Sequence, residues 1–290
     1  MTYPIRSLTL LALCVVTGAC VTPAARVARN AAPSPSARRG DRPAASTAST
    51  AKATQEAIDD EPLITDRPDF TESPAVVARG RIQLEAGETF GREDGSHYLS
   101  LGEALFRVGL NQRLELRVAA NSYGLIREQD VIGTGFEDAS LGVKFAITDA
   151  ARGWRPQMAV IGAVSLPTGA RAMSSQRTLP EVKFISAWEL SDRVGFATNL
   201  NWARASRDGL QHNEYSASGS VAYALTERLG LYAEAFAFRE RMQQLVKRDY
   251  VNGGVTVLLT NDLQLDIRAG RGPSPSRGDF FTGLGLSHRW

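Results

Sequence analysis

Apolar and polar residues alternate with period two from residue 81 to the C-terminus, in stretches of about ten residues separated by turn residues. That length suits a tilted strand crossing a bilayer, and the alternation gives each strand one face for lipid and one for a lumen. The pattern therefore predicts a run of membrane-crossing strands. Twelve are expected, at 81–91, 98–110, 114–123, 136–147, 157–166, 181–190, 194–203, 215–225, 229–238, 250–259, 263–270 and 280–290.

The links between these stretches are of two kinds. Short periplasmic turns and long extracellular loops are typical of outer-membrane barrels, and an even strand number places both barrel ends on the periplasmic side. The tight links, of hairpin length, are 111–113, 191–193, 226–228 and 260–262, and the link 148–156 on the same side is longer. The long polar links are 91–98, 124–135, 167–180, 204–214, 239–249 and 271–279.

One face of the predicted strands is apolar, as at Leu114 and Leu116. Its only ionisable residues are Glu88, Glu137 and His288, each near a strand end. A charge at the bilayer midplane costs roughly 2–4 kcal/mol, and less near the interfaces. We therefore expect this face to contact lipid.

The opposite face carries the charge, which a dry interior would not tolerate without pairing but a hydrated lumen would. A soluble β-sandwich with a polar outer face is the alternative, but it does not explain the uniform strand length. The expected fold is thus an all-β, transmembrane, antiparallel up-and-down β-barrel of about twelve strands over residues 81–290. The charged lumen residues are Glu85, Glu103, Arg107, Glu115, Arg117, Asp138, Lys144, Lys183, Glu234, Asp266 and Arg268.

The N-terminus reads as an export signal over residues 1–19, with Arg6 before a short apolar core. Cys20 follows Thr-Gly-Ala, which resembles a lipobox, so Cys20 is either a lipidation site or a neighbour of an ordinary signal-peptidase site. Residues 20–62 are rich in Ala, Pro, Ser and Thr and predict a disordered periplasmic tether. Residues 63–80 form a separate segment that we expect to act as a periplasmic latch or plug.

Composition excludes some functions. The formal net charge is +2 and no basic stripe is present, which argues against nucleic-acid binding. Both cysteines lie in the first 20 residues, so no disulfide is expected in the barrel. The partners we expect are outer-membrane lipid, a small-molecule solute and the barrel-assembly machinery, because the last strand ends in the aromatic Trp290 and resembles the C-terminal assembly signal. Trp154, Trp188 and Trp290 on one side, with Trp202 and Tyr215 on the other, are candidates for aromatic girdles.

Several motifs carry a family resemblance. They are Thr65–Pro74 (TDRPDFTESP), Gln83–Gly87 (QLEAG), Phe136–Lys144 (FEDASLGVK) and Ser165–Gly169 (SLPTG). With them, residues 63–290 resemble the bacterial outer-membrane proteins named after the meta-pathway of phenol degradation. The resemblance implies a barrel that moves small, often hydrophobic or aromatic, compounds across the outer membrane. The long tether departs from that pattern.

The segment before the first strand holds Asp66, Arg67, Asp69 and Glu72 between two prolines. It is either a turn-rich linker or a latch that folds into the periplasmic mouth. In a latch, the three carboxylates would meet basic residues of the lumen in charge-assisted hydrogen bonds. The basic residues in reach are Arg107, Arg117, Lys144 and Lys183.

Tyr232, Phe236 and Phe238 share the lumen face with Glu234. They would either line a path for an aromatic solute or plug a narrow barrel, since twelve strands lie between side-chain-filled and open barrels. The expected solute path consists of the charged lumen residues above except Asp138, together with Tyr232 and Phe236.

Two other function classes compete with a channel. An outer-membrane enzyme would need a base among His97, His212 and His288, yet no nucleophile elbow, phosphate loop or metal-spaced His/Cys set is present. We therefore expect no catalytic residue, no cofactor and no metal. A structural or envelope-tethering (lipo)protein without transport activity remains the alternative to a channel.

Overall fold

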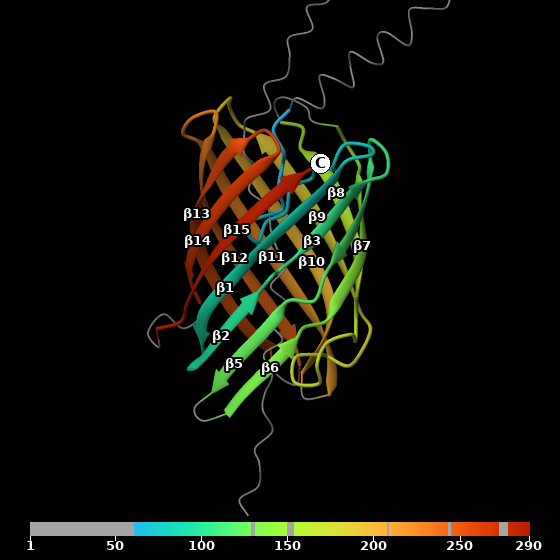
Figure 1. Cartoon of the computed structure of the whole chain (residues 1–290), viewed down its shortest axis with the longest axis vertical. Helices are drawn as coiled ribbons and strands as arrows, with labels where there is room; N and C mark the ends of the chain where they lie inside the picture. Colours follow the sequence, from blue (N-terminus) through green and yellow to red (C-terminus); the bar gives the residue numbers. More distant parts are fainter. Residues whose placement is uncertain (1–60, 129–130, 150–153, 208, 243–244, 273–277) are drawn as a thin grey trace, which may run out of the picture.

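A computed structural model describes residues 61–128, 131–149, 154–207, 209–242, 245–272 and 278–290. Within them the chain forms one antiparallel sheet that closes on itself (Figure 1). No helix in these ranges is long and apolar enough to cross a membrane. The strands are β1 (Ile82–Glu93), β2 (Ser96–Leu101), β3 (Leu105–Gly109), β4 (Leu114–Ala119), β5 (Tyr123–Glu128), β6 (Val131–Phe136), β7 (Ala139–Ala146), β8 (Gln157–Leu166), β9 (Leu179–Glu189), β10 (Val194–Arg207), β11 (Leu210–Ala224), β12 (Leu229–Arg241), β13 (Leu245–Thr260), β14 (Leu263–Arg271) and β15 (Phe280–Arg289).

These segments make twelve barrel strands, because three strands are each interrupted once. β2 continues as β3, β4 as β5, and β6 as β7, and β1 pairs with both β2 and β3. The barrel closes where β1 pairs with β15, from Gln83 opposite Arg289 to Arg92 opposite Phe280. The predicted twelve-stranded barrel is confirmed, and it is the architecture of outer-membrane barrels.

The long links of the barrel hold more strand than the sequence predicted. The regions 124–135, 204–214 and 239–249, expected as loops, contain the extracellular parts of three hairpins, β5–β6, β10–β11 and β12–β13. The alternation of an apolar face marks only the part of a strand that meets lipid. Beyond the membrane both faces of a hairpin meet water, so the polar extensions lacked the signal.

The two faces differ as expected along most of the wall. On β7, Leu141, Val143 and Phe145 are 43–46% exposed outwards, whereas Lys144 between them is fully buried. Glu88 is exposed on the outer face, as predicted. Glu137 is not on that face: it follows β6 at the strand interruption, where the alternation restarts, and it lines the inside of the barrel.

The outer edge of β6 is covered by a loop. Among the described strands β6 pairs with β5 alone, since β8 ends at Leu166, opposite Ala139 of β7, and does not extend alongside β6. The loop 167–178 fills this place, and the Ala170 amide donates to the Phe136 carbonyl at 2.7 Å. The wall at this point is therefore completed by a loop instead of a strand.

Candidate functional site

Part of the described chain before β1 lies inside the barrel. This part of the chain, residues 63–77, is called the lumen segment below. It enters at the end with the tight turns, where Leu63 N–H donates to the Asn261 carbonyl at 2.7 Å and Arg289 donates to the Glu61 carbonyl at 2.6 Å. The segment is irregular and largely buried, so the barrel wall must supply partners for its backbone groups.

Carboxylates of the wall accept hydrogen bonds from its backbone amides. Glu85 accepts from Asp66 N–H at 2.8 Å. Glu234 accepts from the amides of Phe70 at 2.8 Å and Thr71 at 2.6 Å. Hydrogen bonds to a charged acceptor are the stronger kind. Glu115 accepts from Val77 N–H in the same way, at 2.8 Å.

Cations of the wall donate to its carbonyls. Arg107 donates to the carbonyls of Ile64 and Ala75, each at 3.1 Å. Lys144 donates to the Ser73 carbonyl at 2.9 Å. Much of the lumen charge inferred from the sequence therefore serves the backbone of this one segment. Arg268 completes the set by donating to the Pro68 carbonyl at 2.8 Å.

Asp66 is the most highly paired acid of the lumen segment. Its carboxylate lies 2.7 Å from Lys144 Nζ and 3.5 Å from Arg107 Nη1, and it also pairs with Arg117. Burial alone would raise the pKa of Asp66, but the three cations outweigh burial and hold that pKa well below its usual range. Asp66 is thus charged when the segment is docked.

Glu72 and Asp69 have opposite environments. Glu72 pairs with Lys183 at 2.9 Å, so Asp66 and Glu72 both lie against the cations named for them from the sequence. Asp69 meets none of these cations; that part of the expectation is wrong. It is fully buried, and burial together with the nearby Glu234 carboxylate raises the pKa of Asp69 well above its usual range.

Arg67 lies flat against the wall in a slot made by two glycines. Its guanidinium pairs with Glu103 at 2.8 Å and lies 3.6 Å from Asp266. Gly87 of β1 and Gly285 of β15 are directly opposite each other, and a Cβ on either would overlap Arg67. The absence of two side chains therefore makes the room for this one.

Aromatic side chains hold the middle of the lumen segment. Phe70 stacks on Phe236 with ring centroids 4.7 Å apart and meets the edge of Phe238 at 5.2 Å. Tyr250 stacks on the other side of Phe236 at 4.7 Å. Such pairs add about 0.5–1.5 kcal/mol each beyond the area they bury. Phe236 thus contacts the lumen segment.

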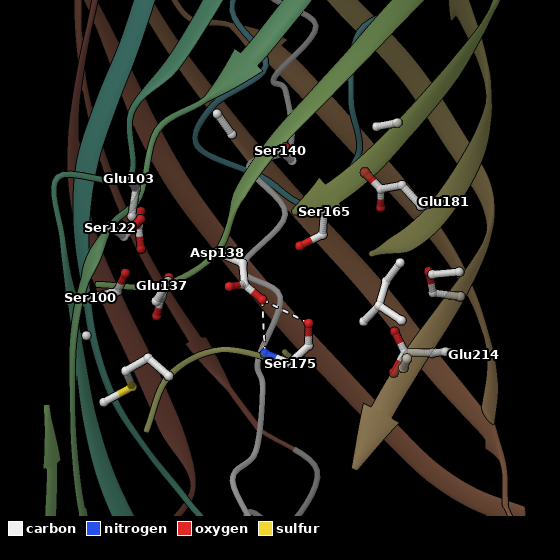
Figure 2. A pocket seen from close by; sticks show the side chains of 18 of the residues that line it. Ser100, Glu103, Ser122, Glu137, Asp138, Ser140, Ser165, Ser175, Glu181 and Glu214 are labelled. Atoms are coloured by element: carbon white, nitrogen blue, oxygen red, sulfur yellow. Dashed lines mark hydrogen bonds between the residues drawn. The ribbon is translucent and has the colours of Figure 1, made fainter. Parts of the chain in front are cut away.

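A chamber of about 520 Å³ lies on the extracellular side of the lumen segment, with Phe70 and Glu72 among its lining residues. Figure 2 shows carboxylates on opposite sides of it, Glu137 on one and Glu181 and Glu214 on the other. Of the residues predicted for a solute path, Glu103, Arg117 and Lys183 line this chamber. The others do not: Glu85, Arg107, Glu115, Lys144, Tyr232, Glu234, Phe236, Asp266 and Arg268.

The chamber wall is acidic, and the sequence pattern predicted only part of it. Among the described residues, ten carboxylates but four Lys or Arg side chains line it. Glu214 and Glu240 lie in stretches interpreted as loops, and Glu137 was placed on the lipid face. Continuing the period-two alternation of β11 and β12 past their outer aromatic residues would have placed Glu214 and Glu240 on the lumen face. The acids are Glu72, Glu93, Asp94, Glu103, Glu128, Glu137, Asp138, Glu181, Glu214 and Glu240.

The family model described as "Putative MetA-pathway of phenol degradation" matches residues 65–290. The chain belongs to this family. The sequence resemblance is thereby confirmed. The match begins at Thr65, so the family's shared region includes most of the lumen segment along with the barrel.

Solved structures of outer-membrane barrels share the fold of this family member. An outer membrane channel from Pseudomonas putida F1 is 14% identical with a TM-score of 0.54, over 77% of this chain and 100% of that one. The NanC porin is 10% identical with a TM-score of 0.50, over 71% of this chain and 98% of that one. No curated protein matches the chain. The protein thus has the fold of an outer-membrane β-barrel.

Proposed function

We propose that this protein is an outer-membrane channel for small molecules with an apolar, often aromatic, body. The observation that carries the proposal is the chamber of about 520 Å³, a size typical of small-molecule sites, on the extracellular side of the lumen segment. The family's description supports the same function, as does the likeness to the P. putida protein, which is an outer membrane channel.

The lining of the chamber fits an amphipathic solute. Leu99, Leu125, Ile126 and Met173 supply apolar surface, and Phe70 adds an aromatic ring from the lumen segment. The surplus of carboxylates favours a solute with a positive or hydrogen-bond-donating group.

Passage to the periplasm requires the lumen segment to move. A cysteine pair tests this directly. The Thr71 and Ser218 hydroxyl oxygens are 2.8 Å apart, so cysteines at both positions lie close enough for a disulfide. In a Cys20→Ala background, the Thr71→Cys/Ser218→Cys protein would lock the lumen segment to β11 when oxidised.

The experiment compares liposome uptake of a small aromatic compound by this variant before and after reduction. We expect slow uptake when oxidised and uptake equal to the parent protein when reduced. The two single-cysteine proteins are the controls and should not respond to the reductant. Equal uptake in both states would show that passage does not need the segment to move. Absence of uptake by the parent protein would favour the tethering alternative.

The N-terminal predictions fall on residues 1–60, outside the described ranges. We propose that residues 1–19 are a cleaved signal and that residues 20–62 lie in the periplasm, because the chain enters the barrel at the end with the tight turns. Labelling with radioactive palmitate, lost in Cys20→Ala, would test lipidation. Recognition of the last strand by the barrel-assembly machinery remains a prediction, testable by assembly of a Trp290→Ala protein.

A further inference from the structure

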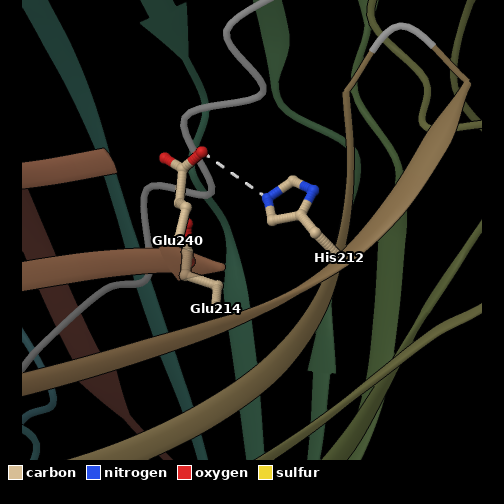
Figure 3. A group of neighbouring side chains, drawn as sticks. All are labelled: His212, Glu214 and Glu240. Atoms are coloured by element: carbon tan, nitrogen blue, oxygen red, sulfur yellow. Dashed lines mark ion pairs between the residues drawn. The ribbon is translucent and has the colours of Figure 1, made fainter. Parts of the chain in front are cut away.

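We propose that His212, Glu214 and Glu240 form a binding site for a divalent transition-metal ion, with Zn²⁺ as the fitting representative, in the wall of the extracellular chamber. His212 and Glu214 are two residues apart on β11, so both point to the inside. Glu240 is directly opposite Glu214 on β12. Figure 3 shows the three side chains converging.

The distances suit a metal better than a direct hydrogen bond. One ligand atom from each side chain lies within 4.8 Å of the others. His212 Nε2 and Glu240 Oε2 are 3.5 Å apart, which is too long for a good hydrogen bond. Two ligands of a tetrahedral zinc ion, each about 2.0–2.1 Å from the metal, are about 3.3 Å apart. Small side-chain shifts would therefore bring this pair to coordination distance.

The charges around the site also favour a cation. Two carboxylates directly opposite on neighbouring strands repel each other. Arg248 on β13 is a cation that faces both: it pairs with Glu240 and lies 3.8 Å from Glu214. Arg248 also lies 3.4 Å from Glu93, whose carboxylate accepts a hydrogen bond from Tyr250 at 2.9 Å. Three carboxylates of the described residues thus lie around the Arg248 guanidinium.

Arg248 does not compete for every ligand atom. It bonds Glu240 through Oε1, while Oε2 faces His212. A partner that fixes one carboxylate oxygen and orients the other is typical of the surroundings of metal sites. One imidazole with two carboxylates suits zinc and similar ions better than Ca²⁺ or Mg²⁺, which prefer oxygen ligands alone. Three protein ligands leave a coordination position toward the chamber.

The inference is tested on the purified full-length barrel by calorimetric titration with Zn²⁺. We expect one saturable site, with affinity lowered about tenfold or more by His212→Gln or by Glu214→Gln. His97→Gln is the matched control, since His97 on β2 stacks near Phe90 on the outer part of the wall and, within the described ranges, belongs to no such group. The heat-dependent gel shift of a closed barrel, measured for each variant, verifies folding.

Binding is read out without any transport assay, so its failure is distinct from failure of the proposed channel function. Unchanged zinc affinity in His212→Gln and Glu214→Gln would overturn the site. Equal affinity for Ca²⁺, insensitive to His212→Gln, would overturn it as well, because the group would then be a simple acidic cluster. A single-channel current reduced by Zn²⁺ in the parent protein but not in His212→Gln would place the ion in the solute's way.

Discussion

Arg67 occupies a slot that exists because Gly87 and Gly285 have no side chains. Adding a methyl group in this slot therefore tests whether Arg67 holds the lumen segment in the barrel. The three atoms nearest to a Cβ at Gly285 are side-chain atoms, of Arg67 and Asp266, whereas those nearest to a Cβ at Gly87 include the Leu284 carbonyl oxygen. Gly285→Ala should therefore push Arg67 away from Glu103 and leave the barrel intact. We expect higher ion conductance in planar bilayers. Gly162→Ala, where a Cβ meets nothing within 4 Å, is the control and should conduct like the parent. Equal conductance of both variants would contradict the role given to the slot.

Lys144 is the residue whose loss should weaken docking most. It bonds the Asp66 carboxylate and the Ser73 carbonyl, and it is fully buried. Removing one partner of a buried pair costs about 3–5 kcal/mol, a factor of more than a hundred in the docking equilibrium. In a Cys20→Ala, Ser73→Cys protein, Lys144→Met should thus speed maleimide labelling of the thiol at position 73 by about hundredfold. Lys247→Met, on the extracellular part of β13, should leave the rate unchanged.

At the scale of elements, Asp138 holds the loop that completes the wall beside β6. Its carboxylate accepts from Gly169 N–H at 3.0 Å. It also accepts from the Ser175 amide and hydroxyl, each at 2.9 Å (Figure 2). Asp138→Ala removes all three bonds and leaves the barrel strands paired. We expect faster trypsin cleavage at Arg171 or Arg177, which lie in this loop, measured by mass spectrometry on the folded protein. Asp192→Ala, in a tight turn at the other end, serves as the control; a cleavage rate equal to the parent's would show that the loop is held by other contacts.

The elements also show how far the sequence reaches. Period two located the membrane part of all twelve strands, because lipid demands an apolar face at every second residue. It misplaced Glu137, because a break between β6 and β7 resets the alternation and nothing local announces the break. The charges of the segment before β1 indicated Asp66 and Glu72 as partners of lumen cations, since buried charges need partners of opposite sign. The sequence could not foresee that Glu85 and Glu234 bond backbone amides, because the course of an irregular segment leaves no periodic signal.

For the whole molecule, docking of the lumen segment should depend on pH in both directions. Because docking lowers the pKa of Asp66, this residue stabilises the docked segment at pH values above its undocked pKa. That stabilisation is lost as the pH falls through the docked pKa. Because docking raises the pKa of Asp69, this residue stabilises the docked segment at pH values below its undocked pKa. That stabilisation is lost as the pH rises through the docked pKa. Labelling of the Ser73→Cys protein, corrected for the reactivity of a free thiol at each pH, should therefore be slowest between the two docked values. Asp69→Asn should reduce the alkaline increase and keep the acid one; an unchanged alkaline increase would remove Asp69 as its cause.

The charge balance of the chamber should make the channel select cations. Ten carboxylates and four Lys or Arg side chains of the described ranges line the chamber, and a narrow lumen with one dominant sign of charge concentrates counter-ions. Under a KCl gradient, the reversal potential should indicate K⁺ passing more readily than Cl⁻. The preference should shrink at 1 M salt, where the Debye length falls to about 3 Å. Glu137→Gln with Glu181→Gln should reduce it, because both line the chamber, whereas Glu88→Gln on the lipid-facing surface should not.

Deleting part of the lumen segment separates the effects of two groups of charges on this selectivity: the carboxylates of the chamber and the wall cations that pair with the segment. Without residues 63–74, the cations that held Asp66 and Glu72 become free to attract anions. Selectivity for K⁺ should therefore fall while total conductance rises. Selectivity could also stay the same after the deletion and after both Gln substitutions. That result would mean that neither the chamber carboxylates nor the wall cations beside the lumen segment control which ions pass.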